Sequence, residues 1–192
     1  IPVIGIFLSL YFAYAGLALG SLLREGRLAL ESIEQQELEQ AREAVSMLVS
    51  RDLNQADRLT LYKTLAETLS ENFNDAVIAP FLWLLVGGPV SQWIYKATST
   101  MDSNWGYKTE KWRYLGFASA RLDDLLAWVP ARVSVFLFWL FARFCKHDGK
   151  WPGYGRIRKD ARQMESPNAG YGMAAAAWLH NAQMGGEAVY FG

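Results

Sequence analysis

The fold of this chain is decided by the stretch ENFNDAVIAPFLWLLVGGPV, residues 71–90. Two carboxylates and two amides lie at its start, directly before an apolar run that is interrupted by Pro80 and by Gly-Gly-Pro at 87–89. Because glycine and proline break helices, the pattern predicts a segment over 76–95 that either enters a membrane and returns or crosses it with a kink. An irregular backbone survives at membrane depth only where protein or a water-filled cavity satisfies its polar groups.

Two other apolar segments predict membrane-spanning helices. Residues 2–23 carry no charge and are long enough to cross a hydrocarbon core of about 30 Å, so we expect a transmembrane helix over 1–23. Arg24 and Arg27 follow at once, which favours a cytoplasmic exit. Residues 125–145 form the last long apolar segment and predict a second transmembrane helix.

The remaining segments predict helices and loops in water. Apolar residues recur at spacings of three and four over 28–75, which indicates a cytoplasmic hairpin of amphipathic helices with Asn54 as the N-cap of the second. Residues 96–124 are polar and charged, and we expect an active-site loop there. A loop and an alanine-rich helix are expected over 146–192. No β pattern occurs, so the sequence predicts an all-α, polytopic membrane helical bundle with a broken or re-entrant helix, formed as a single domain over 1–192.

The composition limits the classes of function. The 192 residues have a formal net charge of zero, 52% of them are hydrophobic, and eight are Trp, a residue that favours membrane interfaces. The balanced charge gives no general attraction to nucleic acid, so we expect no nucleic acid partner and expect the lipid bilayer instead. The single cysteine, Cys145, excludes an internal disulfide. The sequence begins at Ile1 within an apolar segment, and we expect it to be a fragment of a longer chain.

Three clusters of polar residues lie where apolar segments begin or end. In the first, Glu67, Glu71 and Asp75 are spaced by four, which places their carboxylates along one face of a helix. Like charges at this spacing repel each other, so a divalent cation bound by oxygen ligands is the natural compensation. The alternative is an acidic face that is simply solvated.

The second cluster combines Lys96, Asp102 and Lys108 in a stretch that also holds serine, threonine and glycine. Cations beside a carboxylate can hold phosphates while the carboxylate holds Mg²⁺. Neither a GxxxxGK[ST] motif nor a kinase signature occurs, so no standard nucleotide-binding fold is indicated. The alternative is an ordinary interfacial loop whose positive charge lies near lipid headgroups.

The third cluster surrounds the start of the last apolar segment and consists of Arg121, Asp123, Asp124 and Arg132. Adjacent aspartates cannot point the same way on a helix, so one can bind a cation while the other pairs with an arginine. The alternative is a helix start, where aspartates suit the helix dipole. Further on, SPNAG at 166–170 predicts a turn before a helix whose exposed N–H groups would accept an anion. Together the clusters predict a site for a phosphorylated, metal-bound ligand at the membrane surface.

Four longer stretches that contain these residues resemble, in matching order, the adenosylcobinamide-phosphate synthase family of cobalamin biosynthesis (the CobD/CbiB type): 67–90, 95–132, 165–178 and 185–192. The SRDL sequence at 50–53 is similar to the family's Gly-Arg-Asp/Glu-Thr element, although Ser50 and Leu53 depart from it. TSTMDSNWGYK at 98–108 is similar to the family's Asn-Thr-Leu-Asp-Ser-Met-Val-Gly-Tyr-Lys form, with Ser99 in place of the asparagine.

The resemblance implies a multi-pass enzyme of the bacterial inner membrane with its active site facing the cytoplasm. Such an enzyme joins a propionate carboxylate of the corrinoid adenosylcobyric acid to aminopropanol or aminopropanol phosphate, and it uses ATP and Mg²⁺. A carboxylate is a poor acyl donor near pH 7 and needs activation, most simply as an acyl phosphate, which calls for Mg²⁺ and cationic groups around the developing charge. Other late cobalamin-pathway membrane enzymes are a further expected class of partner.

From residue type and motif position we assign expected roles. Metal binding or acid–base catalysis is expected of Glu71, Asp75, Asp102 and Asp123, with Asp124 as a further metal ligand. Phosphates or propionates would be held by Lys96, Lys108, Arg121 and Arg132. Substrate would be oriented by Asn72, Ser166 and Asn168.

Two other classes of function stay open at this stage. One is a non-catalytic membrane sensor or scaffold related to AmpE, the inner-membrane protein associated with β-lactamase induction, which looks distantly similar to the same family. A scaffold has no need to keep Asp102, Lys108, Asp123 and Asn168 together, and all four are present. The other is a transporter with broken helices around a midplane site, which predicts paired internal repeats that the sequence lacks.

Overall fold

The computed structural model describes residues 2–105, 113–144, 151–164 and 166–185. Its elements are, in chain order, α1 (Pro2–Ala15), α2 (Leu19–Gln35), α3 (Leu38–Ser46), α4 (Arg58–Phe73), the π-helix η1 (Asn74–Ile78), α5 (Ala79–Trp105), α6 (Arg113–Leu126), α7 (Trp128–Phe144), α8 (Tyr154–Ala161) and α9 (Ala169–His180). No β-strand occurs in these four described ranges, so the predicted all-α class is confirmed.

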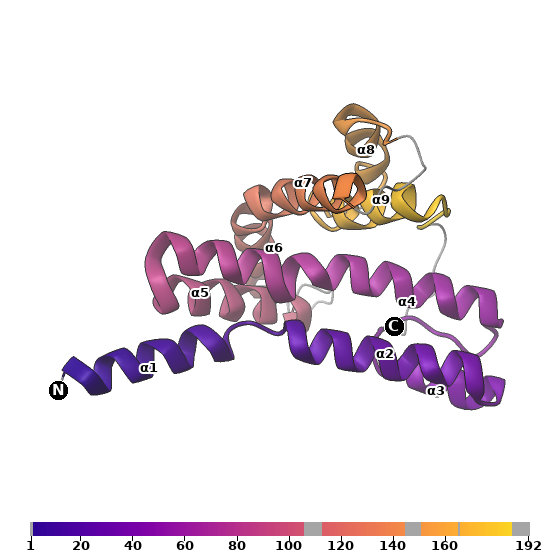
Figure 1. Ribbon diagram of the computed structural model, residues 1–192, viewed down its shortest axis with the longest axis horizontal. Coiled ribbons are helices and arrows are strands. Elements are labelled where there is room, and N and C mark those ends of the chain that lie inside the picture. The colour runs from indigo at the N-terminus through magenta and orange to yellow at the C-terminus, as the bar shows by residue number, and fades with distance from the viewer. Residues whose placement is uncertain (1, 106–112, 145–150, 165, 186–192) are drawn as a thin grey trace.

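The membrane character predicted from the sequence is also found in the structure. Two helical stretches, Val3–Gln35 and Arg58–Trp105, are long and apolar enough to cross a membrane, as judged from length and composition. A third candidate is the pair Gly116–Leu126 and Trp128–Phe144, which meet at a bend of 45°. Large apolar side chains are exposed along the whole of α1, which projects beyond the other helices in Figure 1. A helix that is apolar on every side is typical of a lipid environment.

The apolar helix predicted over 1–23 is divided into two by a close contact. α1 ends at Ala15, and α2 begins at Leu19 and continues into the polar sequence as far as Gln35. Gly16 in the break lies against Gln92 of α5, and a Cβ atom on Gly16 would lie 2.3 Å from Gln92 Cδ. Gln92 Nε2 donates a hydrogen bond to the Ala13 carbonyl at 3.2 Å, which satisfies an acceptor near the end of α1.

The predicted cytoplasmic hairpin consists of three helices, α2, α3 and α4, around one apolar core that includes Ile33, Val45 and Leu61. The prediction of Asn54 as the N-cap was wrong. Asp57 caps α4, because its side chain accepts a hydrogen bond from the Thr60 N–H at 2.8 Å, and this bond lowers the pKa of Asp57. Asn54 belongs to the preceding turn.

The broken segment over 76–95 folds back on itself. Tyr95 Oη lies 3.0 Å from Asp75 Oδ1, whereas 20 residues of straight helix would separate two positions by about 30 Å. The reversal occurs at Gly87 (φ −143°, ψ 23°) and Gly88 (φ 70°, ψ −164°), and only glycine adopts the second conformation readily. Figure 1 shows the chain turning back at this end of α5. The chain thus reverses direction within this segment, which is the shape that a re-entrant helix has.

The described parts of the polar segment over 96–124, residues 96–105 and 113–124, are helical and do not form the predicted loop. α5 continues to Trp105, and α6 begins at Arg113, so its described residues are helical. α5 packs against α6, and Trp83 of the first arm of α5 donates an indole hydrogen bond to the Leu126 carbonyl at 3.2 Å. Some of the polar residues that suggest a loop in the sequence, such as Ser99, Asp102 and Asp123, are half-buried on these two helices.

α9 lies against three other helices, α4, α7 and α8, because glycine permits close approach. A Cβ atom on Gly172 would lie 2.5 Å from the Ser70 carbonyl of α4, and one on Gly170 would lie 2.3 Å from the Ala161 carbonyl of α8. Ala131, Ile157, Tyr171 and neighbouring residues form the apolar core between α7, α8 and α9. This packing holds the start of α9 near the end of α6, where the candidate site lies.

Candidate functional site

Four half-buried aspartates from three elements gather between the helices of the bundle. Asp75 belongs to η1, Asp102 to the last turns of α5, and Asp123 and Asp124 to α6. Asp123 lies within electrostatic range of the other three carboxylates, and Asp102 lies within range of Asp75 and Asp124. The reversal of α5 and the packing of α5 on α6 bring these groups together from positions as far as 49 residues apart in the sequence. We call these four residues the aspartate cluster.

The first predicted acidic face is divided by the π-helix. In η1 the Ala79 N–H donates to the Asn74 carbonyl, five residues earlier, so each turn is wider than in an α-helix. Asp75 is directed to Tyr95, whereas Glu67, two turns earlier, binds other partners. Glu71 lies between them and is exposed. The three carboxylates therefore do not bind one common partner, although the charge of Glu71 still interacts with the other two.

Hydrogen-bonding residues that the sequence analysis missed line the aspartate cluster. Tyr95 Oη and Asn74 Nδ2 both donate to Asp75 Oδ1, at 3.0 and 2.8 Å. The Ser99 side chain lies close to both Tyr95 and Asp123. Tyr95, Ser99 and Asp102 are spaced i, i+4 and i+7, which would have placed them on one helix face had the segment been read as a helix rather than a loop.

A polar turn at the start of α9 is connected to the aspartate cluster. Asn168 Nδ2 donates to the Asp124 carbonyl at 2.8 Å, and Asn168 Oδ1 accepts from Arg132 Nη1 at 2.6 Å. Ser166 Oγ accepts the backbone N–H groups of Asn168 and Ala169 at 3.2 and 3.3 Å, and its hydroxyl neighbours the Asp124 carboxylate. Two residues of the third cluster, Asp124 and Arg132, are therefore connected with the predicted turn of Ser166 and Asn168.

Arg132 occupies the centre of this network. Its guanidinium carbon lies 4.2 Å from the centre of the Tyr171 ring and 4.5 Å from that of Trp128. Besides Asn168, its Nη1 donates to the Trp128 carbonyl at 2.8 Å. Stacking between aromatic rings suits the flat guanidinium and fixes its orientation. The structure thus shows Arg132 holding the turn of Ser166 and Asn168 in place.

The other predicted residues lie around these groups. Lys96 is half-buried on α5, and Asn72 is half-buried near the end of α4. Arg121 is exposed, lies 5.2 Å from the centre of the Phe117 ring and is within electrostatic range of Asp124. Lys108 lies outside the described residues.

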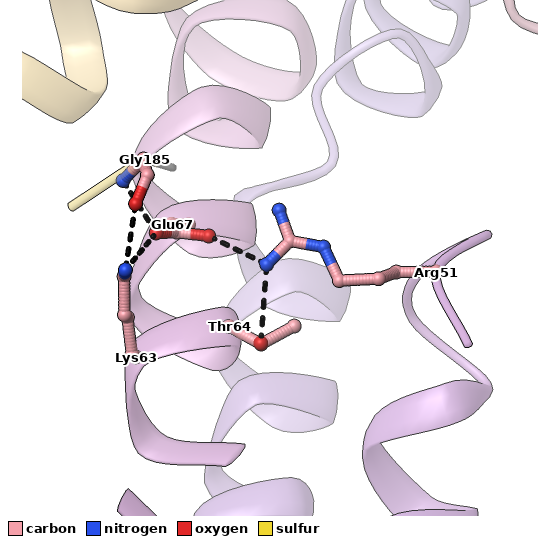
Figure 2. Close-up of polar contacts among 5 residues, drawn as sticks. All are labelled: Arg51, Lys63, Thr64, Glu67 and Gly185. Atoms are coloured by element: carbon pink, nitrogen blue, oxygen red, sulfur yellow. Dashed lines mark hydrogen bonds and ion pairs between the residues drawn. The ribbon is translucent and has the colours of Figure 1, made fainter. Parts of the chain in front are cut away.

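A second polar centre, on α4, has a different character (Figure 2). Glu67 is 4% exposed, and its carboxylate accepts from Arg51 Nη1 at 3.1 Å and from the Gly185 N–H at 2.6 Å. Lys63 Nζ donates to the Gly185 carbonyl at 2.6 Å and lies 3.9 Å from Glu67 Oε1, while Arg51 also reaches Thr64 Oγ1 at 3.5 Å. This clasp, as we call these five residues, joins three stretches of the resemblance: 50–53, 67–90 and 185–192.

The aspartate cluster, by contrast, has little charge compensation, since among the described cations only the exposed Arg121 lies within electrostatic range of one of its members, Asp124. None of its four carboxylates forms a salt bridge with another residue in the described ranges. Asp123 Oδ1 is buried without a hydrogen-bond partner there. Buried carboxylates in this state are neutralised either by a proton or by a bound cation.

Mg²⁺ is a suitable cation for these residues. Across the part of the chain that the structure describes, no group of three or more His, Cys, Asp or Glu residues is arranged to hold a metal ion by itself. Mg²⁺ usually keeps several waters and binds one or two carboxylates together with substrate phosphates. The unpartnered oxygen of Asp123 and the all-oxygen donor set therefore fit an ion that is shared with a phosphorylated ligand.

These features define a helical membrane-type protein with a helix that reverses direction and an acidic site whose described carboxylates form no salt bridge. The sequence pattern of the family described as "CobD/Cbib protein" matches residues 1–192, so the chain belongs to this family of cobalamin biosynthesis.

Several curated relatives carry the name cobalamin biosynthesis protein CobD. Those of Streptococcus sanguinis and Geobacter metallireducens are each 38% identical over 100% of this chain and 60% of their own length. That of Listeria monocytogenes is 37% identical over 95% of this chain and 58% of its own length. The chain thus spans about three-fifths of the relatives it matches. No solved structure matches it significantly.

Proposed function

We propose that this protein forms the amide bond between adenosylcobyric acid and aminopropanol or aminopropanol phosphate, giving adenosylcobinamide or its phosphate, with ATP as co-substrate and Mg²⁺ as cofactor. The observation that carries the proposal is the aspartate cluster, four carboxylates without salt bridges in the described ranges, one of them with a buried, unpartnered oxygen. Membership of a cobalamin-biosynthesis family supplies the pathway.

The proposed chemistry has two steps. In the first, a propionate oxygen of the corrinoid attacks the terminal phosphorus of ATP, and ADP leaves, so that an acyl phosphate is formed. In the second, the amine attacks the acyl carbon, the C–N bond forms, and inorganic phosphate leaves. The amine must lose a proton in this step, and a carboxylate of the cluster is suited to accept it.

The residues have separate roles in this proposal. Bound Mg²⁺ would neutralise charge on the transferring phosphate, and Asp75, Asp102 and Asp123 would hold it, with Asp124 and Glu71 at the edge. Lys96, Lys108 and Arg121 would bind phosphate or propionate groups. Ser166 and Asn168 would orient the substrate on the turn that Arg132 fixes, and Asn72 would assist from α4.

The setting proposed for this reaction is the bacterial inner membrane, with the site facing the cytoplasm, where ATP is available. Apolar helices long enough to cross a membrane support this location. The corrinoid, the amine and the lipid bilayer are the proposed partners, together with other late cobalamin-pathway membrane enzymes.

The main alternative is a scaffold or sensor without catalysis. Repulsion among the four carboxylates of the aspartate cluster destabilises the folded protein unless a ligand compensates it. A scaffold has no use for a cluster that lowers its stability, whereas a ligase would use the carboxylates to bind its ligands. This difference favours the enzyme.

Two aspartate variants of the full-length protein test the proposal. Asp102→Ala and Asp123→Ala should each lower amide formation by at least about 100-fold and should fail to complement a cobalamin auxotroph blocked at aminopropanol attachment. Asp160→Asn is the matched control, because Asp160 is a half-buried aspartate outside the cluster that accepts the Trp178 indole hydrogen bond, which asparagine can also accept. Undiminished turnover in both cluster variants, with folding retained in detergent, would remove these aspartates from the site.

A further inference from the structure

The charge of this chain is balanced overall but strongly segregated along the sequence. Residues 143–162 contain seven lysines and arginines and two aspartates, a formal charge of +5, whereas residues 25–75 contain eleven acidic and five basic residues, a formal charge of −6. The basic segment directly follows the apolar sequence of α7. It includes α8, whose side chains the structure describes.

α8 buries one side and exposes four cations on the other. Ile157 is fully buried and Ala161 is 2% exposed, and both pack in the core formed with α7 and α9. The opposite side carries Arg156, Arg158, Lys159 and Arg162, all exposed, which we call the basic face. Figure 1 shows α8 at the outer edge of the molecule, next to α7 and α9.

The basic face has no internal partner in the described chain. None of its four side chains forms an ion pair or a hydrogen bond with another described residue. The one acidic residue of α8, Asp160, instead accepts the Trp178 indole hydrogen bond at 2.8 Å. The positive charge of this face is therefore free to act on something outside the described structure.

The four cations also face away from the adjoining cavity. A cavity of about 750 Å³ lies between α8, α9 and residues 181–185, and its walls include Asp160, Gln163 and Met164. No residue of the basic face lines it. Cations that converge on a pocket would indicate a small anionic substrate, whereas cations spread over an outer surface match an extended array of phosphates.

From this arrangement we infer that the basic face of α8 binds the phosphate headgroups of anionic phospholipids. Clusters of four or more lysines and arginines beside an apolar membrane helix attract anionic lipid, and guanidinium groups pair well with phosphate. Tyr154, the first residue of this helix, is 47% exposed and is of the type that favours the headgroup region.

The inference also places the candidate site relative to the membrane. Arg162 and Ser166 are four residues apart, so at most about 14 Å of chain separates the basic face from the turn at the start of α9. Lipid binding by α8 would hold that turn at the surface of an anionic leaflet. This conclusion depends on α8 alone, and it holds or fails independently of amide ligation.

The test measures lipid preference with the full-length protein in vesicles of phosphatidylcholine. Energy transfer from tryptophan to dansyl-labelled phosphatidylglycerol is compared with transfer to dansyl-labelled phosphatidylcholine. The wild type should prefer phosphatidylglycerol, and Arg156→Gln/Arg158→Gln should weaken this preference about 30-fold because two charges are lost. The charge-conserving control, Arg156→Lys/Arg158→Lys, should keep most of it.

Each remaining outcome decides against the inference. Equal transfer to both lipids in the wild type, or an unchanged preference in the glutamine variant, would exclude α8 as a headgroup site. Inorganic phosphate is added as a competitor at a concentration matched to the lipid, and sulfate at the same ionic strength is the control. If phosphate abolishes the lipid preference and sulfate does not, the basic face binds free phosphate instead. Circular dichroism of both double variants checks that the helices are retained.

Discussion

Glu67 and Asp75 lie eight residues apart on one continuous helical stretch, yet the surroundings of the two carboxylates differ: one has cationic partners and the other has none among the described residues. Glu67 is almost fully buried, pairs with Arg51 and Lys63, and accepts the Gly185 N–H (Figure 2). Asp75 has two neutral donors, Tyr95 and Asn74, and other aspartates as its charged neighbours.

This difference in charged partners indicates that Glu67 is a structural residue and Asp75 a candidate functional residue. Removing one partner from a buried ion pair destabilises a protein strongly, because the remaining charge stays buried without compensation. Carboxylates that repel one another without cations cost stability, and such clusters occur where function needs them. The comparison therefore assigns the clasp to folding and the aspartate cluster to chemistry.

The largest effect expected from this comparison is on activity. Asp75→Asn should lower amide formation by about 1,000-fold and change the melting temperature little, because asparagine retains an acceptor for Tyr95 and removes a repelling charge. Turnover and fluorescence-detected thermal unfolding are measured on the same full-length preparation. Loss of folding in this variant would contradict the assignment of Asp75 to activity and of Glu67 to stability.

The next effect is on stability. Glu67→Gln should destabilise the protein by about 3 kcal/mol, because Arg51 then lies partly buried without a counter-charge. The matched control is Glu39→Gln, which breaks the exposed pair of Glu39 with Arg42 and should cost less than about 1 kcal/mol. Equal shifts of the melting temperature in the two variants would show that the clasp is no more than a surface ion pair.

Close packing of α9 connects the two acidic regions, and breaking it should have a smaller effect. Gly172→Ala forces α9 away from the Ser70 carbonyl and should cost about 2 kcal/mol. Gly155→Ala on α8 is the control, because a Cβ atom there meets nothing within 4 Å, and it should stabilise by about 0.5–1 kcal/mol. A neutral Gly172→Ala in thermal unfolding would show that α9 can shift freely.

The smallest effect is expected at the cap of α4. Asp57→Ala should lower the melting temperature by less than about 4 °C, while Asp57→Ser, which can still cap, should restore most of it. Because the hydrogen bond from Thr60 lowers the pKa of Asp57, its contribution is present above the ordinary aspartate pKa and is lost as pH falls through the lowered one. Thermal unfolding at neutral and acidic pH should therefore show the wild type converging on the alanine variant in acid.

Part of the candidate site could be read from the sequence because its residues lie in recognisable motifs. Asp102, Asp123 and Asn168 were predicted from such stretches, and the structure connects them in one region. Tyr95 and Ser99 were given no role because the polar segment that begins at residue 96 suggested a loop, whereas its described residues are helical and α5 packs against α6. The separate role of Glu67 was hidden as well, since its partners lie 16 and 118 residues away.

The sequence by itself determined the all-α class, the apolar helices and the break at Gly87–Gly88, because hydrophobic periodicity and backbone freedom are local properties of the chain. Only the tertiary structure decided which acidic residues form ion pairs, as Glu67 does, and which lie close to one another without salt bridges in the described ranges, as in the aspartate cluster. Ion pairing depends on which side chains meet across the bundle, and that follows from helix packing and from the wider turn of η1, neither of which the spacing of residues specifies.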